Sequence, residues 1–173
     1  MPLNATTPKF CYYGNTTNAD SIKKYGALYN WYVVSYANLK KIAPAGWHVP
    51  FHAEWTTLEN HLISKGYSWD GQITSNKIAK SLTAKTDWYN YSTTGTIGCD
   101  LTKNNSSGFS ALPGGFRYRL GTFFYLGYEG YWWSAEDFDA SYAYYRDLRH
   151  DIDYLEQGVD QKLCGFSVRL LQD

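Results

Sequence analysis

The segment Gly130-Tyr131-Trp132-Trp133-Ser134 is a short apolar stretch that begins with a glycine, which is typical of a β-strand. Because neighbouring side chains of a strand point to opposite faces, one of the two tryptophans is expected to point into the core. The run from Tyr142 to Leu148 alternates in the same way, and so does the segment 164–171, in which Phe166, Val168 and Leu170 share one face. Together with the glycine-rich residues 108–117, these stretches predict a mainly antiparallel sheet in the C-terminal half.

The clearest helix is expected after Pro50. Trp55, Leu58 and Leu62 follow the spacing of one helical face, and Gly66 ends the pattern. Phe51 stands where a capping Ser, Thr or Asp is usual.

Three other segments have a less decisive pattern. A short helix is predicted from Asn76 to Leu82, with Ser75 as its cap. The apolar run 25–36 fits either a strand or a buried helix, and residues 46–50 are expected to form a short extended piece that ends at a proline. Helices that precede a sheet in this order indicate an α+β fold.

The chain has 173 residues, which suits one domain with a hydrophobic core. Aromatic residues make up 18% and charged residues 18%, whereas a disordered chain has few aromatics and many charges. No stretch reaches the roughly 18 apolar residues of a membrane span, and the N-terminus lacks the features of a secretory signal, so no membrane insertion is expected. Residues 1–24 are polar and are predicted to be an extended lead-in to a folded domain at 25–173.

The charges are unevenly distributed along the chain. Residues 1–128 hold 12 Lys and Arg against 6 Asp and Glu, whereas residues 129–173 hold 4 against 10. The aromatic-rich end is thus acidic and would repel phosphates, so we expect no nucleic-acid partner.

Metal and redox chemistry find little support in the sequence. Cys11, Cys99 and Cys164 contain no Cys-x-x-Cys pair, and both one disulfide with a spare thiol and three free thiols remain open. His48 and His52 are four residues apart, but Pro50 breaks the helix that would align them. We therefore expect no metal and no cofactor.

Catalytic carboxylates are also not expected. Glu136, Asp137 and Asp139 follow the tryptophan pair, as in a sugar-cleaving enzyme with a stacking platform. Such an enzyme holds two carboxylates across its substrate, whereas a cluster of acids on a loop is usually solvated. Phosphate-binding, dinucleotide-binding and nucleophile-elbow motifs are absent from the sequence.

The strongest signal is the density of aromatic residues near the C-terminus. Between Phe116 and Tyr154, 14 of 39 residues are aromatic. A core does not need so many tyrosines, because buried hydroxyls require partners. Tyrosines interspersed with Arg and Asp have the composition of a binding surface, in which rigid aromatic rings supply contact area at a low cost in entropy. The alternative is an ordinary tyrosine-rich surface.

Several stretches, taken together, resemble one family. They are Tyr25-Gly26-Ala27-Leu28-Tyr29-Asn30-Trp31-Tyr32, Gly46-Trp47-His48-Val49-Pro50 with Ala53-Glu54-Trp55, Gly108-Phe109-Ser110-Ala111-Leu112-Pro113-Gly114-Gly115, Gly130-Tyr131-Trp132-Trp133-Ser134 and Gly165-Phe166-Ser167-Val168-Arg169. In this order they resemble the major paralogous domain (FISUMP) family of bacterial surface proteins and phages of gut bacteria. Residues 1–24 carry little of the resemblance.

The resemblance implies a C-type-lectin-like fold of the branch shared with formylglycine-generating enzymes, in which two helices pack on a small twisted antiparallel sheet and long loops form the ligand face. Domains of this kind also serve as variable proteins of diversity-generating retroelements, where a reverse transcriptase rewrites adenine positions in the C-terminal part of the gene. The segments 118–128 and 137–163 are rich in Tyr, Asp and Arg. Most residues from Tyr142 to Tyr154 are ones that such rewriting can produce, whereas Glu156, Gln157, Gln161 and Lys162 do not fit it. The calcium motif of sugar-binding lectins and the copper-binding cysteine pair of the enzyme branch have no match here.

From the composition and the resemblance we predict a non-enzymatic binding domain on a bacterial cell surface or a phage tail, with a protein or glycan ligand. Its framework is expected to be Trp31, Trp47, Trp55, Phe109, Leu112, Phe116, Phe166 and Val168. Its contact surface is predicted to comprise Tyr118, Leu120, Phe124, Tyr125, Tyr128, Asp137, Phe138, Tyr142, Tyr144, Tyr145, Asp147, Arg149, His150, Asp151, Asp153 and Tyr154. Because residues 136–160 hold 8 acids against 2 arginines, the partner is expected to be cationic or rich in hydroxyls.

Two other classes of function stay open at this stage. One is an enzyme of the formylglycine-generating type on the same scaffold, because a fold does not determine a function. The other is a structural module that decorates a capsid or a fimbria.

Overall fold

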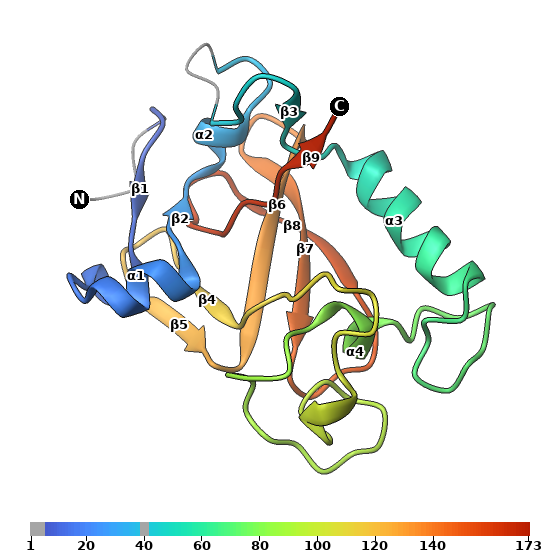
Figure 1. Ribbon diagram of the computed structural model, residues 1–173. Coiled ribbons are helices and arrows are strands. Elements are labelled where there is room, and N and C mark those ends of the chain that lie inside the picture. The colour runs from blue at the N-terminus through green and yellow to red at the C-terminus, as the bar shows by residue number, and fades with distance from the viewer. Residues whose placement is uncertain (1–5, 39–41) are drawn as a thin grey trace.

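The computed structural model describes residues 6–38 and 42–173 and is a mixed α+β structure with few helices (Figure 1). The helices are α1 (Ala19–Tyr25), α2 (Trp31–Val34), α3 (His52–Ser64) and α4 (Ala79–Leu82), with 3-10 turns at Tyr13–Asn15 and Leu101–Lys103. The strands are β1 (Phe10–Cys11), β2 (Leu28–Tyr29), β3 (Trp47–His48), β4 (Gly114–Arg117), β5 (Phe123–Leu126), β6 (Glu129–Asp137), β7 (Tyr142–Arg149), β8 (Glu156–Gln161) and β9 (Leu171–Gln172). The α+β class predicted from the sequence is confirmed.

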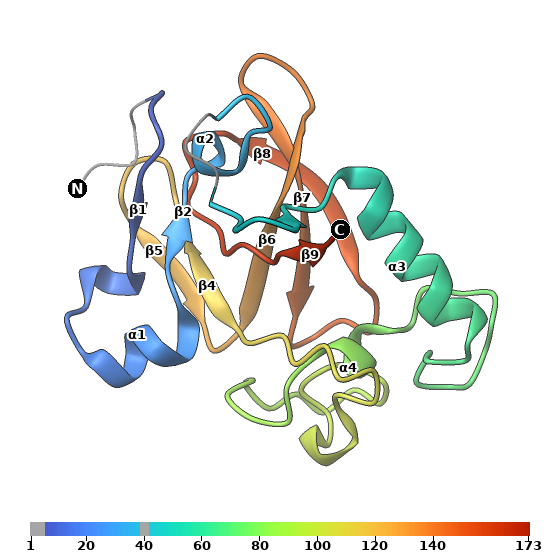
Figure 2. The same cartoon turned by 45° about the horizontal axis from the view of Figure 1, so that its top comes forward.

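The main sheet has the strand order β5-β4-β6-β7-β8. Its neighbours are antiparallel except for β4 and β6, which run parallel and meet at Gly115 and Gly130. Two small antiparallel pairs, β1 with β2 and β3 with β9, stand beside it. In both views α3 lies on the β7–β8 side of the molecule, and the long connection from α3 to β4 forms the end opposite the β6–β7 turn (Figures 1 and 2).

The segment 165–167 closes the sheet where β4 and β6 diverge. Gly165 bridges to Arg117 of β4, and Ser167 bridges to Trp132 of β6. Phe166, between them, bridges to Tyr29 of β2. The strand predicted over 164–171 therefore consists of single bridges followed by the short β9.

Both adjacent tryptophans of β6 are buried, on opposite faces of the sheet. Trp132 packs in a cluster with Trp55 of α3 and Leu148 of β7. Trp133 packs with Trp31 and Phe166 in a second cluster. The prediction that only one of the two tryptophans points into the core is therefore incomplete, because at this pair packed residues cover both sides of the sheet.

Helix α3 carries the predicted apolar face, with Trp55 and Leu62 buried. Its first turn lacks a side-chain cap from Phe51, and the Glu54 carboxylate instead accepts a hydrogen bond from the Phe51 backbone N–H at 2.8 Å. After the helix, Gly66 has a φ of +75°, which is the left-handed backbone that favours glycine at a helix end.

Helix α4 is shorter than predicted and begins at Ala79. Asn76 does not join it, because its side chain donates to the Leu155 carbonyl and accepts from the Leu155 N–H. The prediction that Ser75 caps a helix from Asn76 is therefore wrong: Asn76 ties the loop to Leu155, just before β8, and the Ser75 carbonyl accepts from the Ser68 hydroxyl.

The apolar run 25–36 contains both of its possible structures, since β2 is followed directly by α2. Between them, the buried Asn30 side chain donates to the Thr7 carbonyl and accepts from the Lys9 N–H. These bonds fix the preceding segment against the domain.

The extended lead-in predicted for residues 1–24 contains helical structure in its described part, residues 6–24. Residues 6–24 include β1, a 3-10 turn and most of α1, which the Asn18 side chain caps by accepting from the Ser21 N–H at 2.9 Å. Residues 1–5 lie outside the described part of the chain. Over the described residues, no helix has the length and apolar character needed to cross a membrane.

The predicted framework is confirmed with one exception. Trp31, Trp55 and Phe166 are buried, and the other members except Trp47 are partly buried. Trp47 is 42% exposed, because its strand is a short pair at the border of the molecule. The prediction that Trp47 belongs to the core is therefore wrong.

Candidate functional site

On the side of the main sheet that points away from α3, Trp133 and Ala143 are buried, and the half-buried and exposed side chains around them form one surface, which we call the sheet face. Tyr131 lies opposite Asp147 in the β6–β7 pair, and Asp147 lies opposite Glu156 in the β7–β8 pair, so the three point to the same side. The sheet face comprises Phe116, Tyr118, Phe124, Tyr125, Glu129, Tyr131, Tyr145, Asp147, Arg149, Glu156 and Asp160.

The aromatic part of the sheet face rests on a buried ring. Phe166 is fully buried, and its ring centre lies 4.9 Å from that of Tyr131 and 5.2 Å from that of Tyr145. Phe116 continues the cluster, 5.0 Å from Tyr131 and 5.6 Å from Phe124. Tyr131, Tyr145 and Phe116 stay only partly buried, so they present a rigid aromatic surface.

A distortion of the β4–β5 pair turns one more ring toward this surface. Gly115 and Tyr125 face each other across the pair, with φ of +61° and +64°. Successive strand residues normally point to opposite faces, yet both Phe124 and Tyr125 contact Phe116, at 5.6 and 6.0 Å. A left-handed backbone at a tyrosine costs about 1–2 kcal/mol, which marks Tyr125 as strained in a position that adds an exposed ring.

The acidic part of the sheet face lies over β6, β7 and β8. Asp147 is only 2% exposed, and its Oδ1 has no hydrogen-bond partner among the described residues. Burial and the neighbouring Glu156 raise the pKa of Asp147 to about 7. Arg149 makes an ion pair of 3.3 Å with Glu156, and the Tyr131 hydroxyl donates to Glu129.

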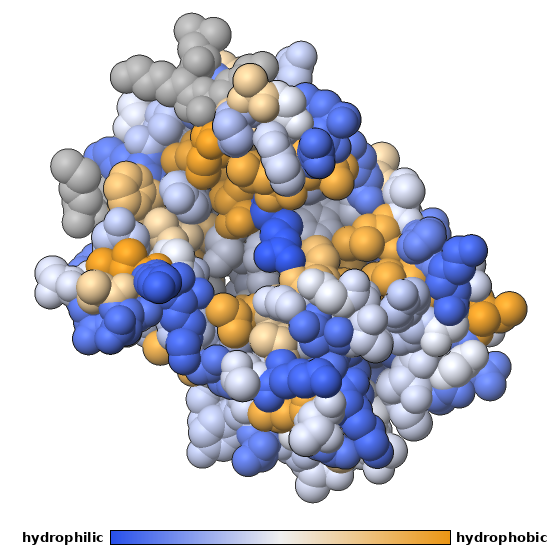
Figure 3. All heavy atoms as spheres, in the orientation of Figure 1, coloured by the Kyte–Doolittle hydropathy of each residue, from blue (hydrophilic) through white to orange (hydrophobic). Residues whose placement is uncertain are grey.

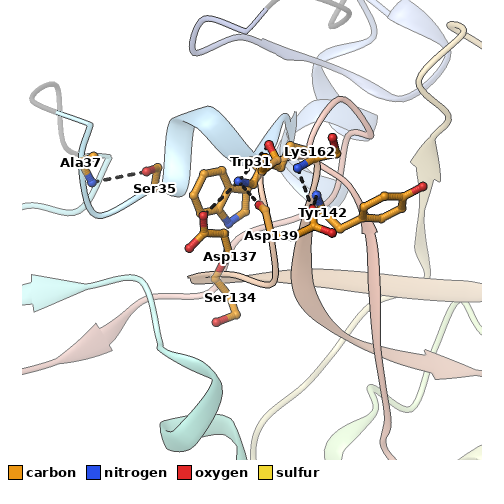
Figure 4. A network of polar contacts seen from close by, with 10 residues as sticks. Trp31, Ser35, Ala37, Ser134, Asp137, Asp139, Tyr142 and Lys162 are labelled. Carbon is orange, nitrogen blue, oxygen red and sulfur yellow. Dashed lines mark hydrogen bonds and ion pairs between the residues drawn. The ribbon is translucent and has the colours of Figure 1, made fainter.

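The β6–β7 turn is held by Lys162, which follows β8 (Figure 4). The Lys162 ammonium lies 4.3 Å from the ring centre of Trp31 and ion-pairs with Asp137 at 3.1 Å. It also donates to the backbone carbonyls of Asp139 and Ala140 at 2.6 and 3.4 Å. These last two hydrogen bonds are made to backbone atoms. They can therefore fix the position of the turn independently of which side chains the turn carries.

Other predicted contact residues surround this turn. Phe138 is 56% exposed, and its ring centre lies 5.6 Å from that of Tyr144. Tyr144 points to the α3 side of the sheet and contacts His52 at 4.3 Å. Tyr142 begins β7, where its N–H donates to the Asp139 carboxylate.

A third set lies at the far end of β7. Tyr128 stacks on Tyr89 at 4.4 Å, and His150 packs edge-on against Tyr128 and Tyr91 at 5.1 and 5.4 Å. Asp153 accepts a hydrogen bond from the Trp69 indole. Asp151 is exposed in the turn after β7, and Tyr154 follows it.

The sixteen predicted contact residues thus do not form one patch. Tyr118, Phe124, Tyr125, Tyr145, Asp147 and Arg149 meet on the sheet face, and Leu120 is exposed in the turn beside it. The β6–β7 turn and the His150 cluster lie at opposite ends of β7, about 25 Å apart for a strand of this length. Asp147 is buried, so the structure does not support it as a freely exposed contact residue.

Sequence reasoning overlooked residues at both of these places. Tyr131, Glu129 and Glu156 belong to the sheet face, and their strand alternation with the buried Trp132 could have found the first two. Tyr89 and Tyr91 are exposed beside His150 but come from a loop before the tyrosine-rich segment, so that only the fold brings them there.

The cavities lie elsewhere. Apolar residues gather over α2 and β3 (Figure 3), around a cavity of 90 Å³ lined by Val33, Val34, Ile42, Trp47 and Phe51 among others. Ligand pockets are commonly about 300 Å³ or larger. A cavity of 610 Å³ is lined by Lys65, Lys80, Lys103 and Asp100 among others, and the Lys80 ammonium there is bonded to the carbonyls of Thr96, Cys99 and Asp100.

The residues considered for metal and redox chemistry are separated. His48 bonds to Asp173 and Glu54, whereas His52 lies 3.2 Å from Arg146. Among the described residues, no group of three His, Cys, Asp or Glu side chains is placed to hold a metal. All three cysteines are free thiols, which settles the alternative that the sequence left open.

Comparison with known proteins places the chain in a family. Residues 2–172 match the model of the Fibrobacter succinogenes major domain, so the match also includes the N-terminal segment that carried little of the resemblance. No curated protein and no solved structure matched the chain. Since the match covers nearly every residue, the chain belongs to the Fibrobacter succinogenes major domain family.

Proposed function

We propose that this protein is a non-enzymatic binding domain with a C-type-lectin-like fold, and that its sheet face and β6–β7 turn bind a protein or glycan on a cell surface. The observation that carries the proposal is the row of partly exposed rings, Phe116, Phe124, Tyr125, Tyr131 and Tyr145, supported by the buried Phe166. Such a row offers contact area that loses little entropy on binding.

The environment of Cys164 favours binding over thiol chemistry at this residue. Burial raises the pKa of the Cys164 thiol to about 12, so it stays protonated at neutral pH. The thiolate is the reactive form of cysteine and its usual form as a metal ligand. Cys164 therefore lacks the environment that thiol chemistry needs.

We further infer that the C-terminal surface is diversified as in a retroelement variable protein, displayed on a bacterial cell surface or a phage tail. Lys162 supports this inference. Lysine is not a product of the adenine rewriting described above, so Lys162 is expected to belong to the constant framework. Its ammonium lies over the ring of Trp31 and donates to two backbone carbonyls of the β6–β7 turn. The side chains of the turn can therefore change while its backbone conformation is kept.

Sequencing the genomic surroundings of the gene tests the diversification. We expect a reverse transcriptase gene with a template repeat that differs from residues 118–163 only at adenines. Sibling copies should vary at codons for exposed residues such as Tyr125 and Phe138, and should keep Trp31 and Lys162. Differences spread evenly over core and surface would contradict this inference and favour a structural module.

Binding itself is tested with the whole chain, fluorescently labelled, on a panel of bacterial cells. Tyr125→Ser should reduce labelling of any strain that binds the wild-type chain. Ile73→Ser is the matched control, because Ile73 is also exposed but lies in the loop after α3. Equal labelling by the two variants would show that the sheet face is not the binding surface.

A further inference from the structure

A cavity between α3 and β9 lies apart from the surfaces described above. Its volume of 280 Å³ is close to the smallest size that is usual for a ligand pocket. In both views the start of α3 lies beside β9 (Figures 1 and 2). Because α3 forms one of its walls, the cavity is separate from the sheet face, which points away from α3. Most of its walls are apolar and consist of Pro50, Trp55, Leu58, Phe109, Leu170 and Leu171.

Arg169 brings a positive charge to this mostly apolar wall. Its guanidinium lies over the ring of Phe109, 4.2 Å from the ring centre, and donates a hydrogen bond to the Phe109 carbonyl. Arg169 is half-buried, and no carboxylate of the described residues forms an ion pair with it. Burial lowers the pKa of Arg169, and no neighbouring acid opposes that effect. Charges removed from water are normally paired, so the wall holds a cation whose counter-ion a ligand can supply.

The remaining donors of Arg169 are open to a ligand. The bond to Phe109 is made by Nη2, and Nε and Nη1 make no hydrogen bond with described residues. These two nitrogens are nevertheless reached by solvent, since they are not among the buried polar atoms that lack a partner. Arg117 differs in this respect, because its Nε and Nη1 are buried without a partner and a ligand cannot reach them. An anion in the cavity can therefore accept hydrogen bonds from Arg169.

The acid that lines the same cavity is engaged elsewhere. The Glu54 carboxylate bonds to the His48 ring at 2.9 Å and accepts from the Phe51 N–H at 2.8 Å. The bonds of His48 to Asp173 and Glu54 raise the pKa of its imidazole, which favours the charged form of His48 beside the Glu54 carboxylate. Glu54 is thus paired with His48, and the charge of Arg169 is left for a ligand.

We propose that this cavity binds a small organic acid, whose apolar body packs against Leu58, Phe109 and Leu171 and whose carboxylate accepts hydrogen bonds from Arg169. The planar guanidinium matches the geometry of a carboxylate. The apolar walls favour a hydrocarbon chain or an aromatic ring as the rest of the ligand. This inference goes beyond the proposed function, because it assigns a site outside the sheet face and the β6–β7 turn.

Other classes of ligand fit the cavity less well. An inorganic anion has no apolar group to pack against the leucines, and a neutral hydrocarbon leaves Arg169 without a counter-ion. An oligosaccharide or a nucleotide carries many polar groups, for which the apolar walls offer no hydrogen-bond partners. The combination of one charge with an apolar body is what distinguishes the expected ligand.

Isothermal titration of the full chain tests the proposal with hydrocinnamate, a phenyl ring on a short chain that ends in a carboxylate. We expect saturable binding that is at least about tenfold tighter than that of hydrocinnamide, its neutral amide, and of acetate, which lacks the ring. The indole N–H signal of Trp55 in NMR should shift as the cavity fills, because Trp55 lines it.

Two variants test the place of binding. Arg169→Met keeps an apolar stem near Phe109 but removes the charge, so it should bind the acid and the amide equally. Leu171→Glu places a carboxylate at an exposed position of the cavity wall, where it should compete for Arg169 and weaken hydrocinnamate binding at least about tenfold. Leu120→Glu is the matched control, because Leu120 is also exposed but lies in the turn between β4 and β5.

The outcomes separate this proposal from the proposed function. Absence of saturable binding, equal affinity of the wild type for the acid and its amide, or unchanged affinity in Leu171→Glu would overturn it. The cell-labelling and genomic tests concern the sheet face and the β6–β7 turn, so their results do not depend on this cavity. Thermal unfolding checks that each variant folds, and the exposed position of Leu171 keeps the test decisive if Arg169→Met does not.

Discussion

The phenol of Tyr145 lies directly over Gly158 on the neighbouring strand. A Cβ at residue 158 would come within 2.6 Å of the Tyr145 hydroxyl oxygen and 2.7 Å of the ring carbon that bears it. The Tyr145 ring therefore packs against the backbone of β8. It can take this position because residue 158 has no side chain.

Gly158→Ala should therefore displace Tyr145 from the sheet face. The obstacle is the far end of a side chain, so the ring can swing aside, and we expect a loss of about 1 kcal/mol in the free energy of unfolding. The Tyr145 ring signals in NMR should shift. Gly114→Ala is the control, because a Cβ there meets only Ser167 Oγ at an ordinary 3.6 Å. An unshifted Tyr145 in Gly158→Ala would contradict the prediction.

The left-handed backbone of Tyr125 predicts an inverted order of two substitutions. Both Tyr125→Ala and Tyr125→Gly remove the ring contacts with Phe116 and Phe124, but only alanine keeps a Cβ at a φ of +64°. Glycine should be the more stable variant by about 1 kcal/mol, whereas it is ordinarily the less stable one in a strand. Urea unfolding of the two variants measures the difference, and a more stable alanine variant would show that Tyr125 is unstrained.

Lys162→Met should loosen the β6–β7 turn while keeping an apolar stem near Trp31. Removing the ammonium leaves the Asp139 and Ala140 carbonyls without their donor, and we expect a loss of about 2 kcal/mol in the free energy of unfolding. Hydrogen exchange of the amides in 138–142 should become faster. Lys103→Met, at an exposed lysine, should change neither quantity. Unchanged exchange in the turn would mean that Lys162 does not anchor it.

The buried Asp147 predicts that stability falls as the pH rises toward neutrality. Its pKa is about 7 in the folded chain and 3.8 without perturbation, so the folded state holds the proton more tightly. The resulting contribution to stability is complete below pH 4 and is lost as the pH rises through 7. A shift of this size corresponds to at most about 4 kcal/mol.

Urea unfolding at pH 4.5, 6 and 7.5 measures this effect. Glu129 has a raised pKa as well, and the His48 pKa is raised through its bonds to Asp173 and Glu54, so the wild-type curve combines several groups. The difference between wild type and Asp147→Asn isolates one of them. That difference should move in favour of Asp147→Asn as the pH rises; a constant difference would show that Asp147 titrates normally.

Periodicity in the sequence was sufficient to predict the helix and the strand that each bury one face. Trp55 and Leu62 marked α3, and the alternation from Tyr142 to Leu148 marked β7, because burial of one face imposes its period on the chain. Asn76 shows the limit of such reasoning: it lies within a helical pattern but bonds to Leu155, 79 residues away. A long-range hydrogen bond of this kind leaves no local trace.

The same contrast applies to the candidate site. Composition pointed to the tyrosine-rich segment, and Tyr125 and Tyr145 do lie on the sheet face. It could not tell that Asp147 would be buried, because that depends on which residues of β6 and β8 stand opposite it. Nor could it bring Tyr89 to His150, since the contact is made by a loop that no pattern in the sequence links to β7.

The bridges made by residues 165–167 have a consequence for synthesis of the protein on the ribosome. β2, β4 and β6 are all translated before the segment that joins them, and each depends on it for a bridge to Tyr29, Arg117 or Trp132. Contacts between such distant parts of a chain form slowly. The nascent polypeptide must therefore wait, with unpaired strand borders, until residue 167 has left the exit tunnel, and this is the interval in which a chaperone would protect it from aggregation.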